Sequence, residues 1–176
     1  FSIFFKKGVP FDLKHWFTPA LIDTEPFEIV GQSKDSVSFQ KRAKLTNYSD
    51  TDFDILIDRT VRVLSREEIK ETLDLKDLPG YLEVVAFDSD NKITNTGDEA
   101  WSKETGLLSI WILGMFNPSP ETTVVIPFNE GDESELGPVV NDAYFGKVPD
   151  DKLVVKKKVL FFSGDGTYRS KIGLST

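Results

Sequence analysis

The chain has 176 residues, a formal net charge of −8 and no cysteine. This length accommodates one domain with a substantial core, and the lack of cysteine excludes disulfides, thiolate zinc sites and a cysteine nucleophile. The acidic balance disfavours nucleic acid as a partner, because the phosphate backbone would be repelled. No run of 18 apolar residues occurs, so no membrane-spanning helix is expected.

The N-terminal region is rich in aromatic side chains. Residues 1–6 are expected to form a short apolar strand, and they begin without methionine or a charged leader, as in the interior of a longer chain. The chain is therefore expected to be a piece of a longer protein. Residues 8–26 contain three prolines and are expected to form an ordered loop, which carries His15 and Trp16.

The clearest pattern is a long alternation of apolar and polar residues at 35–47 and again at 52–64. Period-two alternation predicts half-buried antiparallel strands. The intervening residues 47–50 (Asn-Tyr-Ser-Asp) are typical of a turn, so the two strands are expected to form a hairpin. The apolar positions are Val37, Phe39, Ala43 and Leu45 in the first strand, and Phe53, Ile55, Ile57, Val61 and Val63 in the second.

A short helix and two further strands are expected next. Residues 65–68 have the Ser-x-x-Glu spacing of a capping box and predict a helix that ends near Leu73. Residues 81–88 are expected to form a strand. A turn at 88–91 then leads into another strand at 92–96.

Residues 105–116 (TGLLSIWILGMF) are apolar at both parities. This pattern predicts a strand that is buried on both faces, with a buried helix as the alternative. The strand is favoured because Gly106 and Gly114 bracket the segment and the sequence Asn-Pro-Ser-Pro at 117–120 ends it.

The C-terminal third predicts further strands. Residues 122–128 have high β-propensity, and Gly164-Asp165-Gly166 is expected to join residues 158–163 and 167–174 as a hairpin. The acidic segment 130–135 does not have EF-hand spacing and is interpreted as a solvated loop and not as a calcium site. The sequence also has no phosphate-binding glycine loop and no histidine-rich metal spacing, so no metal site and no cofactor are expected. The sum of eight to ten strands and one short helix predicts a single all-β antiparallel sandwich over residues 1–176.

Three segments resemble an uncharacterised bacterial family with a galactose-mutarotase-like fold. They are FSIFFKKG with FDLKHWFTPALIDTEPF at 1–27, NKITNTGDEAWSKETGLLSIWILGMFNPSP at 91–120, and VVNDAYFGKVPDD with GDGTYRSKIGLS at 139–175. The resemblance implies an antiparallel supersandwich, or a substantial piece of one, whose concave face binds sugars in better-known relatives. It also favours a periplasmic or extracellular location, although the sequence itself leaves the compartment open.

The chain departs from the aldose 1-epimerases that share this architecture. Those enzymes resemble one another in using histidines, one of them as general acid, together with a carboxylate base. This chain has a single histidine, His15, so the acid and base cannot be placed on numbered residues. The resemblance therefore implies sugar binding more than mutarotation, and whether the chain is an enzyme stays open.

His15 and Trp16 form the first candidate site. A flat aromatic ring suits the C–H face of a pyranose, and a histidine supplies a hydrogen bond or a proton near neutral pH. Alternatively, the histidine caps backbone groups in the loop and the indole closes the edge of the sandwich.

Lys41 and Arg59 interrupt two apolar strand faces. Because burying an unpaired cation is costly, each must reach a carboxylate, the sheet edge or a wet cleft. In a cleft, Arg59 would bind sugar hydroxyls or a uronate carboxylate. The alternative is an internal ion pair, for instance with Glu83 or Glu104.

The segment before the apolar run combines an amide, an indole, an ammonium and a carboxylate, the groups that a sugar site uses. Glu104 is the leading carboxylate candidate, as hydrogen-bond acceptor or general base. The alternative is a β-turn whose polar groups satisfy one another. The residues concerned are Asn95, Trp101, Lys103 and Glu104.

Asn117 and Arg169 are weaker binding candidates, as is the pair Asn141-Asp142. Asn117 precedes a proline and is typical of a turn, and Arg169 is expected to face solvent on a hairpin. The sequence thus predicts a carbohydrate-binding protein of mutarotase type, with epimerase-type catalysis or none, and a sugar or uronate as its partner. A non-catalytic structural or interaction domain and a carboxylate-based glycoside-processing enzyme are the alternatives, and the oligomeric state is not indicated.

Overall fold

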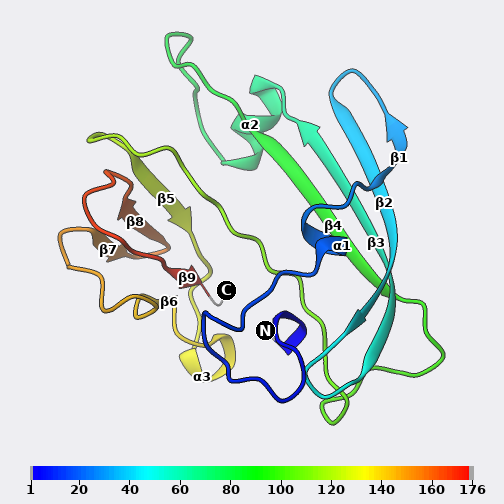
Figure 1. Ribbon diagram of the computed structural model, residues 1–176. Coiled ribbons are helices and arrows are strands. Elements are labelled where there is room, and N and C mark those ends of the chain that lie inside the picture. Colours follow the sequence, from blue (N-terminus) through cyan, green and yellow to red (C-terminus); the bar gives the residue numbers. More distant parts are fainter. Residues whose placement is uncertain (1, 175–176) are drawn as a thin grey trace. The chain divides into compact units, whose positions relative to one another are not determined.

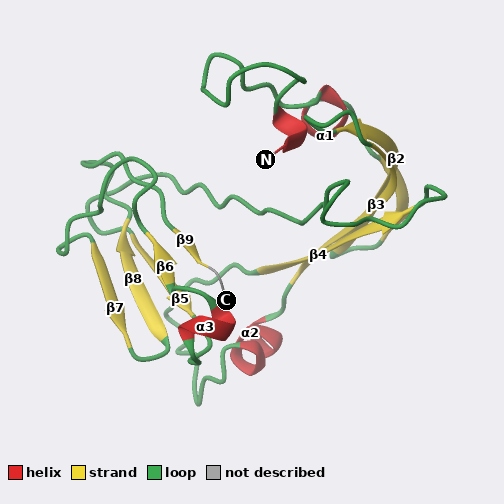
Figure 2. Cartoon of the chain, turned by 90° about the horizontal axis from the view of Figure 1, so that it is seen from below, coloured by secondary structure: helices red, strands yellow, loops and turns green. Residues whose placement is uncertain are grey.

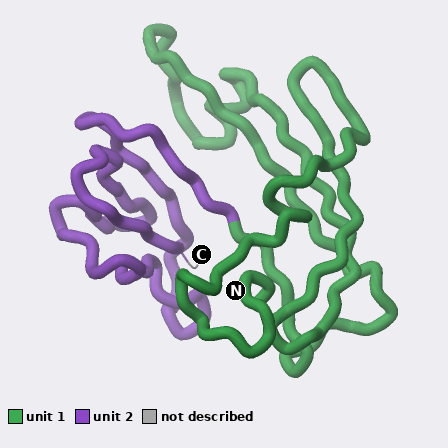
Figure 3. Tube along the Cα trace, viewed as in Figure 1, with its two compact units in different colours: residues 1–111 green, residues 112–176 purple. Residues whose placement is uncertain are grey.

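The computed structural model describes residues 2–174 and confirms an all-β, antiparallel fold (Figure 1). The described part contains nine strands, three short α-helices and one 3-10 helix. The chain divides into two compact units, residues 1–111 and residues 112–176 (Figure 3). The single domain expected from the sequence stays a prediction, and each unit is described by itself.

The first unit is built on one four-stranded sheet in the order β1-β2-β3-β4, in which all neighbours are antiparallel. Strands β2 and β3 bend along their length (Figure 2). The predicted hairpin is confirmed, since β2 and β3 pair continuously from Ser36 opposite Arg62 to Thr46 opposite Asp52. The strands are β1 (Glu28–Gln32), β2 (Ser36–Thr46), β3 (Asp52–Val63) and β4 (Phe87–Asn95).

We call the side of this sheet that carries Phe53 and Ile55 the inner face, and the opposite side the outer face. Ala43, Leu45, Phe53 and Ile55 form the buried core on the inner face at one end of the hairpin. Segments from both sides of the hairpin cover this core and supply most of its apolar surroundings. The partly buried side chains packed against it are Ile3, Leu21, Ile22, Ile57, Ile93, Trp101 and Leu108.

The outer face is a solvated polar surface. Gln40 donates a hydrogen bond to Asp58 and Thr46 donates one to Asp52, both at 2.7 Å. Such cross-strand pairs hold the register, because a slip of one residue would bring these groups to the inner face.

Asn47 ties the hairpin turn to a distant loop. Its side chain is buried, and its Oδ1 accepts hydrogen bonds from the backbone N–H groups of Ser49 at 2.8 Å and Thr51 at 3.0 Å. Its Nδ2 donates to the carbonyl of Thr105 at 3.0 Å. The next residue, Gly106, has φ +120°, and a Cβ there would lie 2.7 Å from Asn47 Nδ2, so this approach requires glycine.

The predicted capping box is confirmed at helix α2 (Arg66–Thr72). The Ser65 side chain accepts from the Glu68 N–H, and the Glu68 carboxylate accepts from the Ser65 N–H. Arg62 also pairs with Glu68. The Ser65 N–H, followed by Arg62, lowers the pKa of Glu68 from 4.5 to about 2.

The strand predicted at 1–6 is wrong. Residues Ser2–Phe4 form a 3-10 helix (η1), and Phe1 lies outside the described residues. The Phe4 ring stacks on Trp16 instead of joining a ladder, with ring centroids 4.5 Å apart, and the Phe4 carbonyl accepts from the Phe17 N–H at 3.0 Å. Residues 8–26 form the expected loop except for one helical turn, α1 (Ala20–Asp23).

The strand predicted at 81–88, with a turn at 88–91, is also wrong, because β4 runs without interruption from Phe87 to Asn95. The ladder to β3 supplies partners to residues that would otherwise favour a turn. The preceding loop is held by Arg66, whose guanidinium donates to the carbonyls of Leu78, Pro79 and Leu82 at 2.8 to 3.0 Å.

Residues 105–116 form neither the predicted buried strand nor the alternative helix. The segment has only an isolated bridge between Ser102 and Gly106 at its start. Ile112 is 70% exposed and Met115 is 85% exposed. High β-propensity was not sufficient here, because no strand within residues 2–174 pairs with this segment.

The second unit contains a three-stranded antiparallel sheet in the order β5-β8-β7 and a two-stranded pair, β6 with β9. The strand predicted at 122–128 is confirmed as β5. Leu160 on β8 and Val148 are the buried apolar side chains in the described part of this unit. The elements are β5 (Thr123–Pro127), α3 (Glu133–Leu136), β6 (Val140–Asn141), β7 (Leu153–Lys156), β8 (Val159–Ser163) and β9 (Gly173–Leu174).

The hairpin predicted around residues 164–166 is wrong, because β8 pairs with β5 and β7 and not with residues 167–174. Asp165 instead organises the loop. Its carboxylate accepts hydrogen bonds from the Lys152 ammonium and from the N–H and hydroxyl of Thr167. These contacts, Lys152 first, lower the pKa of Asp165.

We expect Phe53→Ala to lower the free energy of unfolding by about 3–5 kcal/mol, because the 2% exposed ring leaves a cavity under Trp101. Val63→Ala on the same strand is the control. Its side chain is 53% exposed, so we expect a change of about 0.5 kcal/mol or less. Urea unfolding measures both, and equal losses would contradict the assignment of the core.

The depressed pKa of Glu68 gives its contribution to stability a defined pH dependence. A carboxylate whose pKa is lower in the folded state stabilises the fold above its unfolded pKa of 4.5, and this contribution is lost as the pH falls towards about 2. We therefore expect Glu68→Gln to be less stable than wild type near neutral pH, with the difference shrinking below pH 4.5. Urea unfolding across this range measures it, and a difference independent of pH would count against the capping box as its source.

Candidate functional site

The inner face of the β1–β4 sheet carries positively charged side chains, whereas the acidic side chains of these strands lie on the outer face. Directly paired residues of a ladder point to the same side, so the register assigns every paired position of the four strands to a face. The inner positions include two cations, Lys41 and Arg59, and no carboxylate. The polar inner-face residues are Gln32, Lys41, Arg59, Ser89, Asn91 and Asn95.

Lys41 is neutralised within the unit. Its side chain is 12% exposed, and its Nζ lies 3.1 Å from Oε2 of Glu25 and 5.3 Å from the centroid of the Phe27 ring. The internal ion pair considered for Lys41 is therefore present, but its partner is Glu25 and not Glu83 or Glu104.

Arg59 has a different environment. It is exposed, and within residues 2–174 it makes no ion pair. Its neighbours across the ladder are Phe39 on β2 and Asn91 on β4. The Asn91 amide is oriented by two hydrogen bonds from its Nδ2, to the carbonyl of Ser89 at 3.0 Å and to the Ser89 hydroxyl at 2.9 Å.

These residues form an accessible row across the sheet. Ile29 on β1 lies opposite Phe39 and is 58% exposed, so the row extends to β1 and crosses all four strands of the sheet. We call the surface formed by Ile29, Phe39, Arg59, Ser89 and Asn91 the Arg59 surface. It combines apolar contact area, one guanidinium, one oriented amide and one hydroxyl, which is the mixture expected of a small-molecule site.

The two predicted N-terminal site residues do not lie on the Arg59 surface. His15 is exposed in the loop, where its Nδ1 lies 2.7 Å from Oδ1 of Asp12. This hydrogen bond lowers the pKa of Asp12. Trp16 is half-buried and stacked on Phe4 at an interplanar angle of 11°, and its Nε1 donates to the Thr18 hydroxyl at 3.3 Å.

Trp101 is part of the core. Its indole packs edge-on against Phe53, with centroids 5.8 Å apart, and covers the buried end of the inner face. The tryptophan that the sequence associated with sugar binding is therefore in contact with the hydrophobic core.

The polar residues around Trp101 largely satisfy one another, as in the β-turn alternative. Asn95 Nδ2 donates to the carbonyl of Glu99 at 2.8 Å, and its Oδ1 accepts from the Gly97 N–H at 3.0 Å. Lys103 and Glu104 are exposed in the Ser102–Gly106 turn. A hydrogen bond with the Ser102 side chain lowers the pKa of Glu104, which makes this carboxylate a weaker proton acceptor.

Asn117 and Arg169 belong to the second unit. Both are exposed, and the Arg169 guanidinium lies 4.5 Å from the centroid of the Phe145 ring. Asn141 caps a turn by accepting from the Ala143 N–H at 3.1 Å. The contacts of Asn141 and Arg169 lie within the second unit, so neither is assigned to the Arg59 surface.

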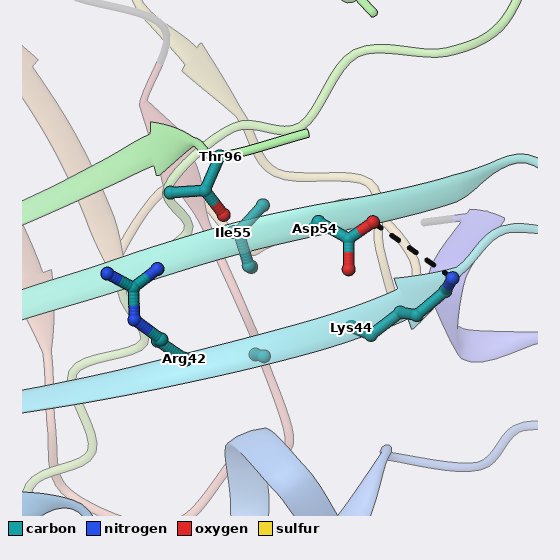
Figure 4. Close-up of a pocket in the computed structure, with 6 residues that line it drawn as sticks. Arg42, Lys44, Asp54, Ile55 and Thr96 are labelled. Carbon is teal, nitrogen blue, oxygen red and sulfur yellow. Dashed lines mark ion pairs between the residues drawn. The ribbon is translucent and has the colours of Figure 1, made fainter. Parts of the chain in front are cut away.

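A shallow hollow lies on the outer face, around the side chains shown in Figure 4. Lys44 is 4.0 Å from Asp54, the pair that is dashed in Figure 4, and 3.0 Å from Asp52. Lys44 is neutralised by these two carboxylates, whereas Arg42 makes no ion pair within residues 2–174. The hollow is lined by a carboxylate, Asp54, and lacks the aromatic ring and the oriented amide of the Arg59 surface. Its lining residues are Arg42, Ala43, Lys44, Asp54, Ile55 and Thr96.

Sequence reasoning identified both inner-face cations but missed their neighbours. The alternation of β2 and β3 placed Lys41 and Arg59 on the apolar face. Asn91 was missed because residues 88–91 were interpreted as a turn, and Glu25 was missed because its contact with Lys41 is formed in three dimensions.

Residues 2–174 contain no cluster of three or more histidine, aspartate or glutamate side chains arranged to hold a metal ion. Their helices are also too short or too polar for any of them to cross a membrane.

The fold and the site together define an antiparallel β-protein with a cationic, partly apolar inner sheet face. Residues 1–176 match the model of a family described as a family of unknown function (DUF6786), and the chain belongs to this family. No curated protein and no solved structure matches the chain. An uncharacterised family was expected from the sequence; its bacterial origin and its galactose-mutarotase-like fold stay predictions.

We expect Trp101→Ala to lower the free energy of unfolding by about 3 kcal/mol, because the indole covers Phe53. Trp101→Phe retains a ring at this position and should lose less than half as much. Urea unfolding distinguishes the variants. If the Trp101→Ala protein had wild-type stability but had lost sugar binding, Trp101 would be a binding residue and not a core residue.

Proposed function

We propose that this chain binds a carbohydrate through the Arg59 surface, in keeping with the sugar-binding sheet face that a galactose-mutarotase-like architecture implies. One observation carries the proposal: an arginine without a carboxylate partner in residues 2–174 lies exposed between an aromatic ring and an oriented amide. A structural arginine on an apolar sheet face would be expected to have such a partner.

The chemistry of the surface suits a pyranose. Phe39 and Ile29 offer apolar contact to the C–H face of a sugar ring. Around them, the Arg59 guanidinium offers several N–H donors in a fixed geometry, and Asn91 and Ser89 offer an amide oxygen and a hydroxyl. A neutral sugar would use these groups through its hydroxyls, and a uronate would add a carboxylate for Arg59.

Binding without hydrolysis has the stronger support. A glycoside hydrolase needs two carboxylates on one site, and an epimerase needs an acid and a base. The inner-face positions of β1–β4 offer neither aspartate, glutamate nor histidine. His15 is paired with Asp12 in the N-terminal loop, and Glu104 is on an exposed turn with a lowered pKa.

A protein-interaction role is the second candidate. It is favoured by Phe87 and Val63, which lie opposite each other on the inner face and are 64% and 53% exposed. An exposed apolar pair of this kind offers contact area to another polypeptide. The two candidates differ in their dependence on Arg59, because a protein contact centred on Phe87 would not need a cation.

We expect Arg59→Ala to weaken sugar binding by about 10- to 100-fold, since hydrogen bonds from a charged donor contribute about 1.5–3 kcal/mol. Isothermal titration calorimetry with a panel of hexoses and hexuronates measures the change. Arg42→Ala is the matched control, because Arg42 lies on the neighbouring strand at an outer-face position. Unchanged binding in Arg59→Ala would remove the Arg59 surface from the site.

A further inference from the structure

The inner-face positions of β1–β4 carry no carboxylate, although the chain has a net charge of −8. Every aspartate and glutamate of β1–β4 occupies an outer-face position, from Glu28 on β1 to Asp90 on β4. On the inner face, Lys41 lies opposite Ile57 and Arg59 lies two residues further along β3. Diagonal neighbours of this kind are about 7–8 Å apart.

Two cations at this separation repel each other unless anions lie close to them. Glu25 supplies one carboxylate, and it contacts Lys41. No second carboxylate of residues 2–174 pairs with Arg59. The local group of Lys41, Glu25 and Arg59 therefore has one positive charge in excess, which matches a ligand with one negative charge.

Glu25 contacts Lys41 from the solvent side. It follows helix α1, and its backbone N–H donates to the Ala20 carbonyl at 2.8 Å. Its side chain is 53% exposed, whereas that of Lys41 is 12% exposed. The carboxylate of Glu25 is thus a negative charge at the edge of the cationic group, where it also repels an incoming anion.

We propose that the Arg59 surface binds a sugar that carries a carboxylate, so that its ligand is a hexuronate and not a neutral hexose. Arg59 binds the carboxylate with its planar pair of N–H donors. Lys41 adds attraction at longer range, and Glu25 limits the affinity by neutralising it. This assignment rests on the proposed carbohydrate function and narrows it to one substrate class.

The test uses the full chain and compares D-galacturonate and D-glucuronate with D-galactose and D-glucose by calorimetry. We expect each uronate to bind about tenfold more tightly than its parent hexose at low salt, and the preference to fall as salt is added. Arg59→Ala should abolish the preference. Glu25→Gln should strengthen uronate binding several-fold, because it removes a nearby like charge.

Asp54→Asn is the matched control for Glu25→Gln. It makes the same change of charge at an outer-face position and should leave the uronate affinity unchanged. Urea unfolding verifies that Glu25→Gln is folded; its amide oxygen still accepts a hydrogen bond from Lys41. Equal tightening in both variants would show a general charge effect and overturn the role of Glu25.

Acetate, a carboxylate without a sugar ring, serves as a further probe. It distinguishes failure of the uronate proposal from failure of the proposed carbohydrate binding. Hexoses that bind as well as hexuronates, both through Arg59, would overturn the carboxylate assignment and leave sugar binding intact. If no sugar binds but acetate shifts the NMR signals of Arg59 and Asn91, the carboxylate site stands without a carbohydrate role. No response to any of these probes would reject both proposals.

Discussion

The continuous pairing of β2 with β3 is the constraint on which the rest of the first unit depends. It places Phe53 and Ile55 beside Leu45 and Ala43 on one face, and the paired polar side chains on the other. A shift of one residue would exchange the two faces. The same register that buries the core at one end of the hairpin brings Arg59 to the inner face at the other end.

Burial therefore decreases along the inner face of the sheet. The buried end contains the core residues, and the exposed part contains the proposed binding residues. Near Phe53 the inner face is covered by Trp101 and by the N-terminal segment. Arg59 lies four residues after Ile55 on β3, and there the inner face is exposed to solvent. Lys41 lies between these regions and is neutralised by Glu25. A cation close to the core needs a carboxylate, whereas one in contact with water remains free for a ligand.

The sequence predicted the features that depend on neighbours along the chain. The hairpin and the capping box of α2 follow from short-range patterns, and the structure confirms both. Residues 105–116 and β4 were predicted wrongly because pairing with other strands decides their conformation. For the site, alternation identified Lys41 and Arg59, but their partner Glu25 and neighbour Asn91 depend on contacts between distant segments.

The cover of the core has a consequence for the order of folding. The hairpin joins residues that are close in sequence, whereas Ile3 and Trp101 pack against the core from positions about fifty residues before and after Phe53 in the chain. Closing such long loops costs entropy, so local pairing is favoured early and long-range docking later. We therefore expect the β2–β3 hairpin to form first, with the apolar side chains of its inner face still exposed to solvent. In this partly folded state, the positive charges of Lys41 and Arg59 on the apolar side oppose aggregation with other partly folded chains.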